Sequence, residues 1–123
     1  MTLGLVCFGI SPAFADDLCR RDEKKVLFAI DQICGDTWCE GDSNFQFRKI
    51  RCNFKLGSCA LEFRTAPWKN SDDEEYDWSK PKTCVLRNVE SLDSLIDTNR
   101  QVPVLLDGPY EQITTCIDHL NSR

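Results

Sequence analysis

The only histidine of the chain, His119, is the residue that a Ser–His or Cys–His catalytic pair would require. No Gly-x-Ser-x-Gly sequence, which forms the nucleophile elbow of α/β-hydrolases, accompanies it. We expect His119 in the last turn of a C-terminal helix, where the helix dipole favours a cation. The 20 Asp and Glu residues offer many carboxylates, but their spacing singles out no acid–base pair. The sequence therefore favours a protein without catalytic residues, and a small secreted hydrolase that uses carboxylates is the alternative.

Metal-ligating residue types occur in two patterns. Cys116 and His119 are spaced i, i+3, which is half of a zinc site, but the other ligands would be cysteines that export oxidises. Two oxygen-rich segments would suit calcium, namely Asp36, Glu40, Asp42 and Asn44, and residues 72–75 with Asp77. Neither segment has the spacing of an EF-hand loop. We expect no metal and no cofactor, with a calcium-binding exported domain as an alternative.

Residues 65–82 have no hydrophobic periodicity and are long for a loop inside a compact domain. The segment combines aromatic with acidic side chains, and its candidate binding residues are Trp68, Asp72, Asp73, Glu74, Glu75, Tyr76 and Trp78. Exposed aromatic residues are typical interface anchors, and the acids would attract a basic partner. The leading hypothesis is a non-enzymatic binding or interaction module with a protein partner of basic character.

The same aromatic residues have a structural interpretation. The tryptophans of the 65–82 segment would then fold back over the sheet while the acids stay solvated. Trp38, beside Cys39, has the same two interpretations, as a lid over the core or as a contact residue.

Eight cysteines in a chain of 123 residues indicate disulfides, because such a density is typical of small exported proteins. Cys52 and Cys59 flank a predicted hairpin turn and should face each other across it. Cys34 and Cys39 lie at the two ends of a short Gly-containing loop. We expect one bridge at each of these places.

A third bridge has three competing cysteines: Cys19, Cys84 and Cys116. A Cys84–Cys116 bridge would link the last helix to the third strand. Seven cysteines follow the predicted signal peptide, so we expect three bridges and one free thiol.

The N-terminal segment has the form of a signal peptide. Residues 2–14 carry no charged side chain and end in Ala13-Phe14-Ala15, a small-x-small pattern that signal peptidase accepts. About 13 apolar residues are too few to span a bilayer, so we expect no membrane anchor after cleavage. Residues 1–15 are the predicted signal peptide and residues 16–123 a single disulfide-rich globular domain, located in the periplasm or outside the cell.

Hydrophobic periodicity predicts the elements of this domain. Val26, Ile30 and Ile33 form the apolar stripe of a first helix over residues 17–34. A hairpin follows over residues 44–64, with a slip in the alternation that indicates a β-bulge near Arg48 and Lys49. The remaining predicted elements are a strand over 83–89, a short helix over 91–97, an extended edge segment over 101–106 and a last helix from residue 107. The fold class is α+β, a short antiparallel sheet packed against an N-terminal and a C-terminal helix and stapled by disulfides.

The charge balance bears on partners. Twenty acidic against 15 basic side chains give a net charge of -5. Nucleic acids and anionic membranes both require a basic face, so this balance argues against either as the partner.

We predict that the exported protein begins at Asp16, because Ala13-Phe14-Ala15 is the one good cleavage site in the N-terminal segment. N-terminal sequencing or intact mass of the exported protein checks this. A chain that retains Met1 or Thr2 after export contradicts it.

Overall fold

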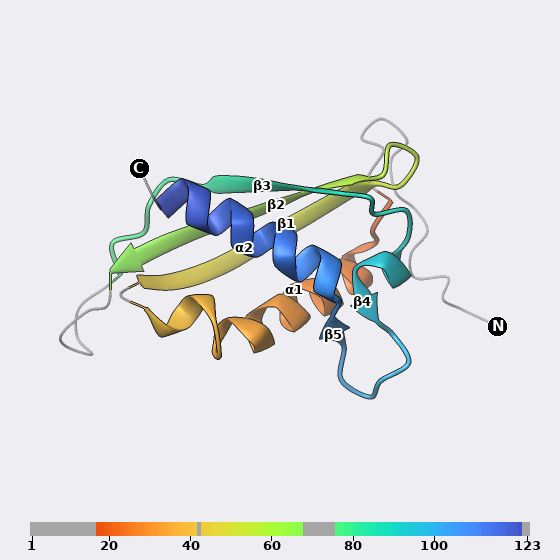
Figure 1. Ribbon diagram of the computed structural model, residues 1–123, viewed down its shortest axis with the longest axis horizontal. Coiled ribbons are helices and arrows are strands. Elements are labelled where there is room, and N and C mark those ends of the chain that lie inside the picture. The colour runs from red at the N-terminus through yellow and green to blue at the C-terminus, as the bar shows by residue number, and fades with distance from the viewer. Residues whose placement is uncertain (1–16, 42, 68–75, 122–123) are drawn as a thin grey trace.

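The computed structural model describes residues 17–41, 43–67 and 76–121, and the predicted signal peptide lies outside these ranges (Figure 1). The elements in chain order are α1 (Arg20–Cys34), η3 (Trp38–Glu40), β1 (Ser43–Asn53), β2 (Ser58–Pro67), β3 (Lys82–Arg87), η4 (Leu92–Ser94), β4 (Ile96–Asp97), β5 (Val104–Leu105) and α2 (Asp107–Asn121). This is the α+β fold that the sequence predicts, with helices at both ends of the described chain.

The main sheet has three antiparallel strands in the order β1-β2-β3. β1 and β2 form the predicted hairpin, and their register shifts between Phe47 and Lys49, where the sequence indicates a bulge. Gly57 is the last residue of the turn before β2 and has a φ of 68°, a left-handed conformation that glycine adopts without steric cost. The hairpin and its irregularity are thus confirmed.

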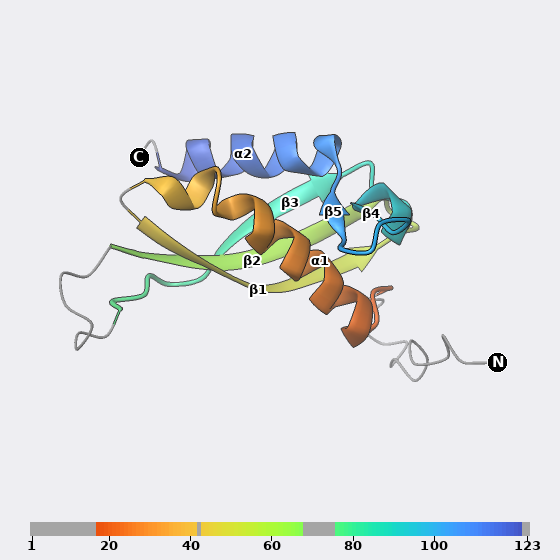
Figure 2. The ribbon, with the colours of Figure 1, turned by 90° about the horizontal axis from the view of Figure 1, so that it is seen from below.

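Both helices pack against the same face of this sheet (Figure 2). Leu61 and Phe63 of β2 point into the core with 0% and 1% of their surface exposed. Ala60, the residue before Leu61, is exposed on the other face of the sheet. Ile30 of α1 and Ile113 of α2 belong to the same buried cluster. The strand period of two therefore gives the sheet one apolar face under the helices and one polar face that no described helix covers, which we call the bare face.

The edge of β1 is protected by hydrogen bonds to Asp17, which precedes α1, and to Glu23 in the first turn of α1. The Asp17 N–H donates to the Cys52 carbonyl at 2.8 Å, and the Phe54 N–H donates to Asp17 Oδ2 at 2.7 Å. The Ile50 N–H donates to Glu23 Oε2 at 3.0 Å. These hydrogen bonds satisfy backbone N–H and C=O groups that would otherwise be free to pair with a strand of another protein chain.

The edge of β3 is protected in a similar way by α2. The Arg87 N–H donates to Gln112 Oε1 at 2.7 Å, and Gln112 Nε2 donates to the Arg87 carbonyl at 2.9 Å. The side-chain amide of Gln112 thus replaces the peptide group of a neighbouring strand.

Three disulfides hold the elements together. Cys52 pairs with Cys59 across the hairpin, and Cys34 pairs with Cys39 across the turn after α1. Cys84 pairs with Cys116, which links β3 to α2. The first two pairs are those expected from the spacing, and the third is one of the alternatives that the sequence left open.

The expectation of one free thiol is wrong. Cys19 is disulfide-bonded as well, so none of the described cysteines is free.

The predicted short helix over residues 91–97 is also corrected. Only Leu92–Ser94 form a 3-10 turn, and Ile96 instead starts the strand β4. β4 pairs with β5, Ile96 opposite Leu105 and Asp97 opposite Val104, in a separate two-stranded sheet. Within the predicted extended segment over 101–106, only β5, a strand of two residues, is formed. β5 pairs with the two-residue strand β4 and not with the main sheet.

We predict that the three bridges contribute unequally to stability. Replacing Cys84 and Cys116 by Ala should lower the free energy of unfolding by about 4 kcal/mol, against about 2.5 kcal/mol for Cys52 and Cys59, because a cross-link restricts the unfolded chain more when it closes a longer loop. The two sequence separations are 32 and 7 residues. Urea denaturation of the two double variants measures both losses. A larger loss for the hairpin pair would contradict the chain-entropy explanation.

Candidate functional site: a groove with a basic rim

A groove with a volume of about 570 Å³ lies between α1 and the β4–β5 hairpin. Its volume is in the range of sites that hold small organic ligands. One wall is α1, and the other is the segment of residues 96–103, which starts in β4 and continues through the loop that leads to β5. We call it the α1 groove.

The helical wall of the α1 groove consists of Arg21, Lys24, Lys25 and Phe28. These positions are spaced i, i+3, i+4 and i+7, which places them on one face of the helix. The opposite face carries the buried residues Val26, Ala29, Ile30 and Cys34. Burial of that apolar face in the core turns the basic face toward the groove and toward solvent.

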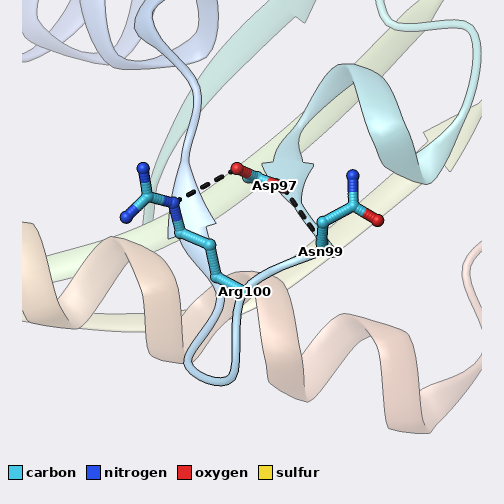
Figure 3. A network of polar contacts seen from close by, with 3 residues as sticks. All are labelled: Asp97, Asn99 and Arg100. Atoms are coloured by element: carbon cyan, nitrogen blue, oxygen red, sulfur yellow. Dashed lines mark hydrogen bonds and ion pairs between the residues drawn. The ribbon is translucent and has the colours of Figure 1, made fainter.

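The second wall is held in shape by polar contacts of the loop between β4 and β5 (Figure 3). Arg100 Nε lies 3.2 Å from Asp97 Oδ2, and the Asn99 N–H donates to the other carboxylate oxygen of Asp97 at 3.0 Å. Thr98 Oγ1 donates to Asp93 Oδ1 at 3.0 Å. The loop therefore presents Arg100 on a fixed backbone.

The α1 groove is electrostatically positive. Four basic side chains line it, and no acidic residue is among the described residues of its wall. Arg100 pairs with Asp97, and Arg21 has a long contact of 3.8 Å with Asp22. Lys24 and Lys25 form no ion pair with any described residue, so their ammonium groups are available to an anion.

The groove is also apolar at its floor and margin. Phe28, Ile96 and Pro103 contribute to its lining. Five large hydrophobic side chains are exposed among the described residues, and three of them, Phe28, Val102 and Val104, belong to α1 or to the β4–β5 hairpin. Exposed apolar surface beside unpaired cations suits a ligand that has both an anionic and an apolar part.

The lining of the α1 groove also contains neutral polar side chains. Thr98 and Gln101 add neutral hydrogen-bonding groups to the ammonium and guanidinium groups. Desolvation disfavours the carboxylate of Asp31 in α1 and raises its pKa, and this residue does not line the groove.

Most of the predicted binding residues of the 65–82 segment lie outside the described residues: Trp68, Asp72, Asp73, Glu74 and Glu75. Tyr76 and Trp78 are described, and their rings lie 5.4 Å apart. The guanidinium carbon of Arg64 lies 4.8 Å from the centre of the Trp78 ring, so Trp78 packs against the sheet. An interface formed by this segment stays a prediction.

Trp38 packs as a lid over one end of the core. Its ring stacks on Tyr110 at 5.5 Å and meets the edge of Phe47 at 5.9 Å. Its Nε1 donates to Thr114 Oγ1 at 2.9 Å. Of the two interpretations of this residue, the lid is the one that the structure supports.

The candidate metal ligands are used for other purposes or remain apart. Cys116 is bonded to Cys84, so it has no thiolate to offer to zinc beside His119. Within the described ranges, no three His, Cys, Asp or Glu side chains are grouped as a metal site would require.

Sequence reasoning missed the α1 groove. The apolar stripe predicts the first helix, but it assigns no function to the basic residues on the other side of that helix. A signal was present, because Phe28 lies on the basic side of the predicted helix rather than in its apolar stripe. The other wall comes from residues about 70 positions further along the chain, so only the folded structure brings the two together.

In comparisons with known proteins, no family model, curated protein or solved structure matches this chain. None of the described helices is long and apolar enough to cross a membrane.

We predict that the aromatic residue of the groove contributes little to folding. Phe28 is 46% exposed, so Phe28→Ala should lower the free energy of unfolding by about 1 kcal/mol. Trp38→Ala is the matched control and should cost about 3 kcal/mol, because it leaves a cavity between three elements. Thermal and urea denaturation of the two variants measure this, and equal losses would mean that Phe28 belongs to the core.

Proposed function

We propose that the protein is an exported, non-enzymatic binding module that holds a small anionic ligand with an apolar body in the α1 groove. Export to the periplasm or the extracellular space is part of this proposal. It is supported by the described disulfides, since stable disulfides form in oxidising compartments, and by the signal-like residues 1–15.

The observation that carries the proposal is the combination of Lys24 and Lys25, both without an ionic partner among the described residues, with the exposed ring of Phe28 one helical turn away. An isolated cation at the surface is solvated and binds anions weakly. An adjoining apolar wall excludes water on one side and strengthens the attraction. A carboxylate, sulfonate or phosphate linked to a short alkyl or aromatic group satisfies both parts of the groove.

Polar residues on the second wall would orient the anionic group. The side-chain amide of Gln101 provides a hydrogen-bond donor, and Arg100 adds a guanidinium that is held by Asp97. The Thr98 hydroxyl already donates its hydrogen to Asp93, so it shapes the wall and does not donate to the anion. A carboxylate that approaches Arg100 shares this guanidinium with Asp97, so the free charges of Lys24 and Lys25 supply the main attraction.

We predict that octanoate binds in the α1 groove and that octanol, which has the same chain without the charge, binds at least about threefold more weakly. Titration of isotopically labelled protein followed by amide NMR shifts gives both affinities and the location. The shifted amides should be those of α1 residues 21–28 and of residues 96–103. Raising the salt concentration should weaken octanoate binding and leave octanol binding unchanged, because only the charged contact is screened.

Variants test the residues. Lys24→Gln with Lys25→Gln should weaken octanoate binding by roughly three- to tenfold, and Phe28→Ala should weaken both ligands. Lys55→Gln with Lys80→Gln is the control, since these two exposed lysines remove the same charge away from the groove. Equal binding of octanoate and octanol, or equal losses in both lysine pairs, would contradict the proposal.

A further inference from the structure

The bare face of the main sheet is a second surface with an unusual charge. β1 and β3 flank β2, and both helices lie on the other side of the sheet (Figure 2). On the bare face, register places Lys49 opposite Glu62, and Arg51 opposite Ala60. Ala60 is in turn opposite Val85. Except for the half-buried Glu62, these side chains are exposed.

Basic residues dominate this face. The three strands contain six Lys or Arg residues and one acidic residue, Glu62, although the whole chain has a net charge of -5. Lys82 alternates with the exposed positions of β3 and reaches Thr65 Oγ1 at 3.5 Å, so it is not counted here. We call the remaining five the sheet patch: Arg48, Lys49, Arg51, Arg64 and Arg87.

Four of the five cations in the sheet patch are arginines, whose planar guanidinium groups bind carboxylate and sulfate groups through paired hydrogen bonds. Arg64 is held in place, because it lies over the Trp78 ring and donates from Nε to Gln46 Oε1. Lys49 and Arg51 are two residues apart on one strand, about 7 Å along its direction. The patch therefore presents several positive charges along one face of the sheet, with Arg64 held in place, which suits a polymer with repeated anions better than a single small ion.

The remaining side chains of the face indicate which polymer. Register and alternation place Gln46, Asn53, Ser58 and Thr83 beside the cations, and each carries a neutral amide or hydroxyl group. Among the described residues, this face has one exposed large apolar side chain, Val85, and the half-buried ring of Trp78, which lies against Arg64. This apolar area is small for insertion into lipid or for the apolar centre of a protein interface. Amides and hydroxyls beside arginines match a partner that has hydroxyl groups between its anionic groups.

From this combination we propose that the sheet patch binds a linear acidic polysaccharide, one that carries carboxylate or sulfate groups along its chain. The patch lies on the face of the sheet opposite to the helices, so the polysaccharide site is independent of the α1 groove and of its ligand.

Polygalacturonate oligomers are a suitable probe, because each sugar carries a carboxylate, and their methyl esters are the uncharged control. Isothermal titration of the full exported protein should detect binding of the oligomers and none of the esters. Lys49→Gln with Arg51→Gln should weaken binding by roughly tenfold and reduce its salt dependence. Lys24→Gln with Lys25→Gln removes the same charge from the α1 groove and should leave polygalacturonate binding unchanged.

Other polyanions provide the outcomes that would overturn the proposal. Polyglutamate, an oligothymidylate and vesicles of phosphatidylglycerol test an acidic protein, a nucleic acid and a membrane. Tighter binding of any of them than of polygalacturonate at equal charge concentration would show that the polysaccharide is the wrong partner. If the sheet-patch variant and the α1-groove variant lost polygalacturonate affinity equally, only the net charge of the protein would matter. If the methyl esters bound as tightly as the acids, the arginines would have no role in binding.

Discussion

The structure depends on the burial of the inner side chains of β2 under two helices. Leu61 and Phe63 lie at the centre of the sheet, and the cluster that contains them reaches Ile30 of α1 and Ile113 of α2. A domain of this size has one such core, so both helices must share the same face of the sheet. Two consequences follow from this one constraint. The other face of the sheet is left bare, and α1 keeps a face that points away from the core, which becomes one wall of the groove.

The distribution of charge follows the same layers. α2 carries three acidic residues and no Lys or Arg, whereas the three strands carry six basic residues and one acidic residue. The net charge of -5 is an average over these surfaces and describes none of them. An argument from net charge against anionic partners therefore holds for the acidic surface only. The two proposed ligands are both anions because the two surfaces proposed to bind them are both basic.

Rigidity is supplied by covalent and polar links at the margins of the sheet. The Cys84–Cys116 disulfide and the amide of Gln112 both attach α2 to β3. Asp17 and Glu23 attach the start of α1 to β1. A binding site needs side chains on elements that do not move relative to one another. The links between α1 and β1 hold the helical wall of the groove to the sheet, while the Asp97–Arg100 contact holds the shape of its other wall.

The sequence by itself determined the elements that depend on local patterns. Alternation gave the hairpin and the bulge before Lys49, a stripe at helical spacing gave α1 and α2, and short separations gave the Cys34–Cys39 and Cys52–Cys59 pairs. The error at residues 91–97 has a different cause, since Ile96 is in a strand only because Leu105 pairs with it. The groove and the sheet patch were likewise decided by the tertiary structure alone. Both surfaces consist of side chains from segments that lie far apart in the chain. The local sequence around these basic residues does not indicate a binding surface, because only the packing of the elements brings their charges together.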